Sequence, residues 1–319
     1  MTKIRVLFNV ISTLDLNVII PKIKSLGMNS ISIFGNLGYK TLPVHFKTIG
    51  KEFENIVVNL YHPPTFENRK NWEQILRKDG ERTIAALAEV GINHYAWMIE
   101  LNLYGQSFNP LVKRYVSRNK LHHHFNTFYE IAHDVNPDAK VIIVPYPHAL
   151  INLDCGFRGW KDWWVKKGEN LKFDMVSLNA HIGTWIPAPT RANVIKHLTN
   201  SINFLQDRGH PVFYVEVGYP THGFKPLLGW YGWGREKDQI SMLKTCYQAL
   251  KARKVPYMQV CEFIDPHPGQ LNYEPFFGEQ GKHPKFLGMT VTEELHWGLL
   301  RCDGTEKPVC KLIRKITKS

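Results

Sequence analysis

Short runs of apolar and β-branched residues recur along this chain and alternate with stretches of helical periodicity. Between most of the runs, apolar residues return every three or four positions, which predicts amphipathic helices with one buried face. One such stretch, residues 194–205, is followed by Gly209, a residue typical of a helix C-terminus. The stretch 36–54 fits poorly, because glycine and proline interrupt a helical pattern there. The predicted strands are residues 4–10, 28–34, 55–61, 94–102, 140–146, 172–181, 211–217 and 256–264.

Strands that alternate with helices over 319 residues predict an α/β fold, a single (β/α)8 TIM barrel. No Pro-, Gly- or Ser-rich linker divides the chain, so residues 1–319 are expected to form one domain. An open, doubly wound sheet is the alternative, but no Gly-x-Gly-x-x-Gly turn follows an early strand. The barrel is favoured, and its active site is expected at the C-terminal ends of the strands.

A carboxylate interrupts the seventh predicted strand. Residues 212–221 read Val-Phe-Tyr-Val-Glu-Val-Gly-Tyr-Pro-Thr, so Glu216 lies in an apolar run that Gly218 and Pro220 then end. Carboxylates are rare inside apolar strands unless they are paired or functional. Strand alternation turns Glu216 to the face opposite Val215 and Val217, the interior of the barrel. Glu216 is therefore the first candidate for a catalytic residue.

Other polar residues lie where the remaining strands are expected to end. On the fourth strand, Trp97, Ile99 and Leu101 share one apolar face, which predicts that Glu100 and Asn102 point inward. Two inward glutamates suit glycoside hydrolysis, in which one carboxyl donates a proton and the other, ionised, attacks the anomeric carbon. The further candidates at strand ends are Tyr61, Tyr146, His148, Asn179, His181 and Asp265.

Aromatic residues in the predicted loops support a sugar substrate. Trp185 follows the sixth strand, and Trp230 and Trp233 lie in the Gly-rich loop after the seventh. Indole faces offer flat apolar platforms for sugar rings and keep an N–H for hydroxyl groups. We therefore expect these loops to line a carbohydrate-binding cleft.

The charge and the cysteines narrow the picture further. A net charge of +12 and a pI of about 9.4 are compatible with an anionic partner, for which an acidic polysaccharide fits better than a nucleic acid. Much of the excess charge is diffuse, however, and charge runs are usually solvated faces. Five scattered cysteines without a Cys-x-x-Cys pair argue against structural zinc and favour reduced thiols. The first residues lack a long apolar run with a cleavage site. The sequence thus predicts a cytoplasmic monomer that does not cross a membrane.

The motifs resemble those of clan A glycoside hydrolases, the retaining β/α-barrel glycosidases. Residues 215–221, Val-Glu-Val-Gly-Tyr-Pro-Thr, are similar to the seventh-strand nucleophile motif of the family 17 β-1,3-glucanases and the family 53 galactanases. The close of the chain, with Glu-Leu-His-Trp-Gly-Leu at 294–299 and Asp-Gly-Thr-Glu-Lys-Pro at 303–308, resembles that of family 17-like enzymes. The resemblance implies a retaining hydrolase of β-linked oligo- or polysaccharides that needs no metal or cofactor.

The same resemblance implies roles for individual residues. Glu216 would be the nucleophile, oriented by His181, and Asn102 would bind the sugar 2-hydroxyl. Trp297 would form the floor of the sugar-binding subsite at the bond that is cleaved. The fourth strand departs from the family pattern of Asn-Glu, because Leu103 follows Asn102 here. Glu100 is therefore the candidate acid/base.

Two alternatives to a glycosidase follow from these residues. If Asn102 aligns with the family asparagine, the acid/base is lost at Leu103 and the chain is a non-catalytic carbohydrate-binding barrel. A metal-dependent barrel, such as a sugar isomerase or an endonuclease, is the other alternative. Its candidate ligands are His62, Glu100, His148, His181, Glu216, Asp265 and His267.

Overall fold

The computed structural model describes most of the chain. The described residues are 1–8, 16–38, 44–61, 71–98, 101–102, 118–147, 157–181, 191–219, 221, 235–265, 285–286, 289–290 and 296–318.

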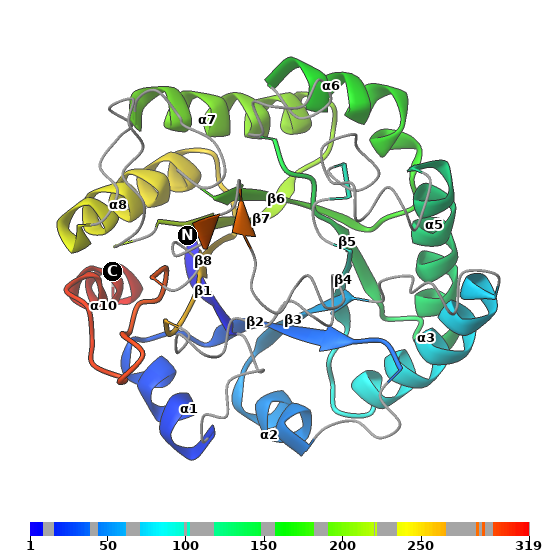
Figure 1. The fold of residues 1–319 in the computed structure, drawn as a ribbon, viewed down its shortest axis with the longest axis horizontal. Coiled ribbons are helices and arrows are strands. Elements are labelled where there is room, and N and C mark those ends of the chain that lie inside the picture. The colour runs from blue at the N-terminus through cyan, green and yellow to red at the C-terminus, as the bar shows by residue number, and fades with distance from the viewer. Residues whose placement is uncertain are drawn as a thin grey trace. The chain divides into compact units, whose positions relative to one another are not determined.

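The strands of the described chain form a closed barrel in sequence order, from β1 to β8 (Figure 1). This arrangement confirms the predicted (β/α)8 TIM barrel. A short antiparallel pair, β9 (Lys285–Phe286) and β10 (Met289–Thr290), stands outside it. The barrel strands are β1 (Lys3–Phe8), β2 (Ser30–Asn36), β3 (Asn55–Tyr61), β4 (His94–Trp97), β5 (Lys140–Ile143), β6 (Met175–His181), β7 (Val212–Gly218) and β8 (Tyr257–Cys261).

Helices follow most of the strands, as the periodicity predicts. They are α1 (Leu16–Ser25), α2 (Val44–Glu52), α3 (Trp72–Ala88), α5 (Arg118–Val135), α6 (Phe157–Lys166), α7 (Arg191–Asp207), α8 (Glu236–Ala252) and α10 (Val309–Thr317). Helix α2 forms within the stretch 36–54, where no helix was expected, because Phe46 and Ile49 supply a buried face that docking stabilises. Gly209, at a φ of 81°, ends helix α7 as predicted.

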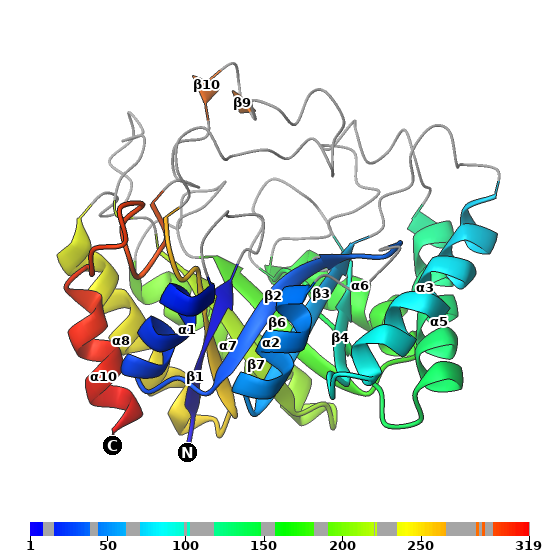
Figure 2. The same ribbon diagram turned by 90° about the horizontal axis from the view of Figure 1, so that it is seen from below.

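The described residues divide into two compact units, one of residues 1–31 and 180–319 and the other of residues 32–179. In the first unit, β8 pairs in parallel with both β1 and β7. Helix α10 packs against α8 and β1 (Figure 2). Its Thr317 Oγ1 donates to the Leu26 carbonyl at 2.8 Å, where Gly27 has a φ of 77°.

In the second unit, β4 pairs with β3 and β5, and helices α3 and α5 lie side by side (Figure 2). Trp97 at the end of β4 packs against Trp72 of α3 and against Phe125 and Phe128 of α5. Trp97 therefore faces the helices, as the alternation predicts. The strand ends there, short of the predicted 102, because Met98 has a φ of 51° and leaves the extended conformation.

None of the helices in the described part of the chain has both the length and the apolar character needed to cross a membrane.

Candidate active site

Glu216 lies on the interior face of β7, near the C-terminal end of the strand. Its side chain is 3% exposed. Its neighbours Val215 and Val217 are fully buried on the opposite face, and β7 packs against helices α7 and α8. Since successive side chains of a strand point to opposite faces, Glu216 points away from these helices. The alternation of Val215, Glu216 and Val217, which predicts an inward Glu216 from the sequence, is therefore present in the structure.

Gln259 on β8 is the direct partner of Glu216. The two residues are register partners on adjacent parallel strands, and the Gln259 amide Nε2 donates a hydrogen bond to Oε2 of Glu216. Gln259 is completely buried. Sequence reasoning missed this residue, because the pairing depends on the register between two strands that lie 43 positions apart.

Arg5 on β1 occupies the same level of the barrel. It is the register partner of Gln259 on the other side of β8, and it is completely buried. Its guanidinium carbon lies 4.2 Å from the ring centroid of Tyr257 and 5.2 Å from that of Tyr214. Burial lowers the pKa of Arg5 to about 10, so the group still carries its charge at neutral pH. Glu216 thus shares its layer with a buried cation.

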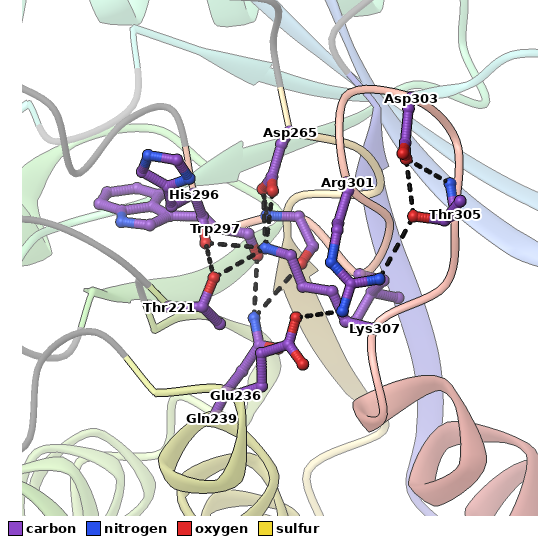
Figure 3. Close-up of polar contacts among 12 residues, drawn as sticks. Thr221, Glu236, Gln239, Asp265, His296, Trp297, Arg301, Asp303, Thr305 and Lys307 are labelled. Atoms are coloured by element: carbon purple, nitrogen blue, oxygen red, sulfur yellow. Dashed lines mark hydrogen bonds and ion pairs between the residues drawn. The ribbon is translucent and has the colours of Figure 1, made fainter.

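Asp265, which follows β8, belongs to a buried ion pair (Figure 3). Lys307 Nζ lies 2.9 Å from Oδ1 of Asp265 and 2.8 Å from Oδ2, and the backbone N–H of Gly298 also donates to Oδ1 at 2.6 Å. The same ammonium donates to Thr221 Oγ1 and to the His296 carbonyl, each at 3.0 Å. The predicted contact of Asp265 with substrate stays a prediction, whereas its structural partner is Lys307.

Trp297 lies in the segment that Lys307 and Asp265 hold in place. Its side chain is 4% exposed, and its backbone carbonyl accepts a hydrogen bond of 3.3 Å from Gln239 of helix α8. The Gln239 amide also donates to the carbonyls of Tyr219 and Gly298. One helix side chain therefore ties the end of β7 to the segment of Trp297, the predicted floor of the sugar site.

In the second unit, the structure brings Asn102 and Tyr146 together. The Asn102 amide donates to the Tyr146 carbonyl at 2.9 Å and accepts from the Tyr146 N–H at 2.8 Å. Both residues are buried, and so is Asn179, whose backbone N–H donates to the Pro145 carbonyl. Asn102 thus fixes the backbone after β5, a role that the sequence did not suggest.

The remaining predicted site residues are only partly covered. Tyr61 and His181 end strands β3 and β6, but their side chains lie outside the described part of the chain. The residues that lie wholly outside it are Glu100, His148, Trp185, Trp230 and Trp233.

The described residues contain no group of three or more His, Cys, Asp or Glu side chains that could hold a metal ion. Four of the candidate ligands lie outside the described residues, so the metal-dependent alternative is not tested: His62, Glu100, His148 and His267.

Comparison with known proteins gives a likeness of fold. No protein-family model matches the sequence, and no curated protein matches it. A β-glucuronidase of Bifidobacterium dentium, complexed with coumarin-3-O-glucuronide, is 15% identical with a TM-score of 0.61, and the match covers 100% of this chain and 47% of that one. A GH2 β-galacturonidase of Eisenbergiella tayi, bound to galacturonate, is 12% identical with a TM-score of 0.62, over 100% of this chain and 51% of that one.

The GH53 catalytic domain of Ignisphaera aggregans matches nearly end to end. It is 12% identical with a TM-score of 0.59, and the match covers 98% of this chain and 95% of that one. By contrast, the chain spans about half the length of the first two proteins. The similar structures thus include glycoside hydrolases of families 2 and 53, and the chain shares their barrel fold.

Proposed function

We propose that this chain is a retaining glycoside hydrolase that cleaves β-linked oligo- or polysaccharides, with Glu216 as its nucleophile. The observation that carries the proposal is the buried carboxylate of Glu216 near the C-terminal end of β7, which accepts the Gln259 amide. In barrels of this fold the C-terminal ends of the strands carry the catalytic groups. The sequence motif around Glu216 and the glycosidase fold of the similar structures support the same reaction.

In this mechanism, ionised Glu216 attacks the anomeric carbon and forms a covalent glycosyl ester as the glycosidic C–O bond breaks. Glu100 gives its proton to the departing oxygen. Glu100, now a carboxylate, then takes a proton from water, and the oxygen of that water bonds to the anomeric carbon and releases Glu216. Two inversions leave the configuration of the sugar unchanged.

We further propose that the substrate carries acidic sugars. The net charge of +12 favours anionic ligands. Two of the similar structures hold a bound glucuronide and a bound galacturonate, although the identity of 12–15% transfers only the fold. Uronic acids joined by β-linkages are therefore the substrates to be tested first.

The direct test uses 4-nitrophenyl β-glycosides of glucuronic acid, galacturonic acid, glucose, galactose and mannose. Release of nitrophenol identifies the sugar, and proton NMR of the first anomer formed shows whether the configuration is retained. We expect retention, because a nucleophilic carboxylate gives a double displacement. Inversion would rule out Glu216 as a nucleophile.

Variants then assign the two carboxylates. Glu216→Gln is expected to lower kcat by about four orders of magnitude or more, the scale on which loss of a nucleophile acts. Glu100→Gln is expected to spare substrates with good leaving groups and to impair those with poor ones, because only the latter need protonation. The control is Glu89→Gln, an exposed glutamate at the end of α3. Full turnover by Glu216→Gln would contradict the proposal.

A non-catalytic carbohydrate-binding barrel is the second candidate. Leu103 favours it, because this residue follows Asn102 at the position where the resembled family has its acid/base glutamate. Titration calorimetry with the same sugars distinguishes the two functions. Binding by the wild type without release of product from any of them would support the second candidate.

A further inference from the structure

Gln259 makes a contact that the proposed pair of carboxylates does not explain. Its amide nitrogen donates to Oε2 of Glu216, and both side chains are buried on adjacent strands. An ionised carboxylate can only accept hydrogen bonds, so the orientation of the Gln259 amide is fixed by Glu216. A buried glutamine held in this way restricts the carboxylate in return.

A neutral donor suits a nucleophile. A hydrogen bond to the charged form of a carboxylate favours that form, and the amide of Gln259 donates such a bond to Oε2 of Glu216. The positive charge of the layer comes from Arg5, which is the register partner of Gln259 rather than of Glu216. Among the described residues, the phenols of Tyr214 and Tyr257 are titratable groups that lie near Arg5.

We propose that Gln259 is a positioning residue for the nucleophile. By binding Oε2, it holds the carboxylate of Glu216 so that Oε1 is the oxygen that bonds to the anomeric carbon. It acts through Glu216 and makes no contact with the sugar in this role. The inference rests on the proposed function, and its test includes a measurement that does not depend on turnover.

The first measurement is the pH profile of kcat/KM for Gln259→Leu, which has a similar volume and no donor. We expect a loss of tenfold to a hundredfold, because hydrogen bonds to charged groups are among the stronger ones in proteins. The acidic limb of the profile is expected to move to higher pH, since ionised Glu216 loses a donor. The control is Gln206→Leu on helix α7, where the lost amide donates to the Arg253 carbonyl.

Gln259→Glu supplies a matched rescue. At acidic pH, a protonated Glu at this position can donate to Glu216 much as the amide does, so this variant is expected to exceed Gln259→Leu in kcat/KM. At alkaline pH the two carboxylates repel each other and the advantage is expected to vanish. A purely structural role for Gln259 would give Gln259→Leu a loss that does not depend on pH, and Gln259→Glu would not exceed Gln259→Leu at acidic pH.

The second measurement is a double-mutant cycle in stability, which needs no substrate. Gln259→Leu is introduced into the wild type and into Glu216→Gln, and denaturant midpoints are compared at pH 7 and at about pH 3, where carboxyls are largely protonated. We expect a larger fall in the midpoint in the wild-type background at pH 7, and equal falls in both backgrounds at acidic pH.

The outcomes separate the two proposals. If no sugar is cleaved but the cycle shows the pH-dependent coupling, the contact between Gln259 and Glu216 stands and the proposed function fails. If sugars are cleaved, and the acidic limb of Gln259→Leu coincides with that of the wild type, Gln259 is not a positioning residue. Equal falls in both backgrounds at pH 7 would also overturn the inference.

Discussion

At the scale of single residues, Lys307 and Asp265 form a buried ion pair. Lys307 is 2% exposed, and its ammonium is shared among Asp265, Thr221 and the His296 carbonyl. Burial lowers the pKa of Lys307 and raises the pKa of Asp265, while the attraction between them acts against both shifts. This pair is compensated within the fold. Glu216 accepts a hydrogen bond from the neutral amide of Gln259, the contact on which the proposed positioning role depends.

The ion pair gives a prediction for stability. Lys307→Met is expected to lower the free energy of unfolding by about 3–5 kcal/mol, because it leaves the buried carboxylate of Asp265 without its cation. Denaturant unfolding monitored by circular dichroism measures the change. The double variant Asp265→Leu/Lys307→Met is expected to recover much of the loss, since it removes both charges. A single variant that costs less than about 1 kcal/mol would show that the pair is dispensable.

At the scale of elements, the segment between β8 and α10 depends on a close approach of backbones. Leu299 and Leu300 donate hydrogen bonds to the Phe263 carbonyl, and Asp265 donates to the Leu300 carbonyl. A Cβ on Gly298 would lie 2.3 Å from the Asp265 nitrogen and 2.6 Å from the Leu300 oxygen. The backbone at Gly298 and the backbone at Asp265 can approach this closely only because glycine has no Cβ. Gly298 therefore fixes the position of its neighbour Trp297.

Gly298→Ala therefore tests the segment. We expect a loss of several kcal/mol or failure to fold, because the added methyl group meets backbone atoms that cannot move aside. Gly209→Ala is the matched control, since its Cβ would meet nothing within 4 Å and only its φ of 81° opposes the substitution. That control is expected to cost about 1–2 kcal/mol. The melting temperatures of both variants are measured by thermal unfolding. Equal shifts for the two variants would contradict the close approach of the backbones at Gly298.

At the scale of the whole molecule, net charge is the property that bears on function. A surplus of 40 basic over 28 acidic side chains creates a positive field that attracts anions over distances set by the ionic strength. A field of this kind affects substrate capture more than it affects folding. Such a field would favour acidic over neutral substrates without a dedicated binding residue.

Salt is therefore expected to weaken the capture of an acidic substrate. Raising sodium chloride from about 0.05 M to about 0.5 M shortens the screening length to a few ångströms, so kcat/KM for a uronide should fall several-fold. A neutral β-glucoside serves as the control and should change little. Progress curves at each salt concentration give both values. Identical salt dependence for the two substrates would argue against anionic selectivity.

The sequence alone predicts the barrel fold and the inward direction of the Glu216 side chain, because both depend on local regularities. Period-two alternation in residues 212–218 determines which way Glu216 points, and Gly209 ends α7 through its own conformational freedom. Alternation also gives the facing of Trp97, but β4 ends at that residue, and Met98 beyond it adopts a positive φ that alternation does not predict. Glu100 lies outside the described residues, so its inward direction stays a prediction.

What only the tertiary structure decided is which distant side chains meet. The pairing of Gln259 with Glu216 follows from the register of β8 on β7, and that of Lys307 with Asp265 joins residues 42 positions apart. The side-chain amide of Asn102 likewise forms two hydrogen bonds with the backbone of Tyr146, 44 positions away. Local sequence patterns determine the conformation of a segment and the direction of its side chains, since both depend on residues that are near in sequence. Contacts across the barrel depend on how the strands close, and that is set by packing of the whole chain.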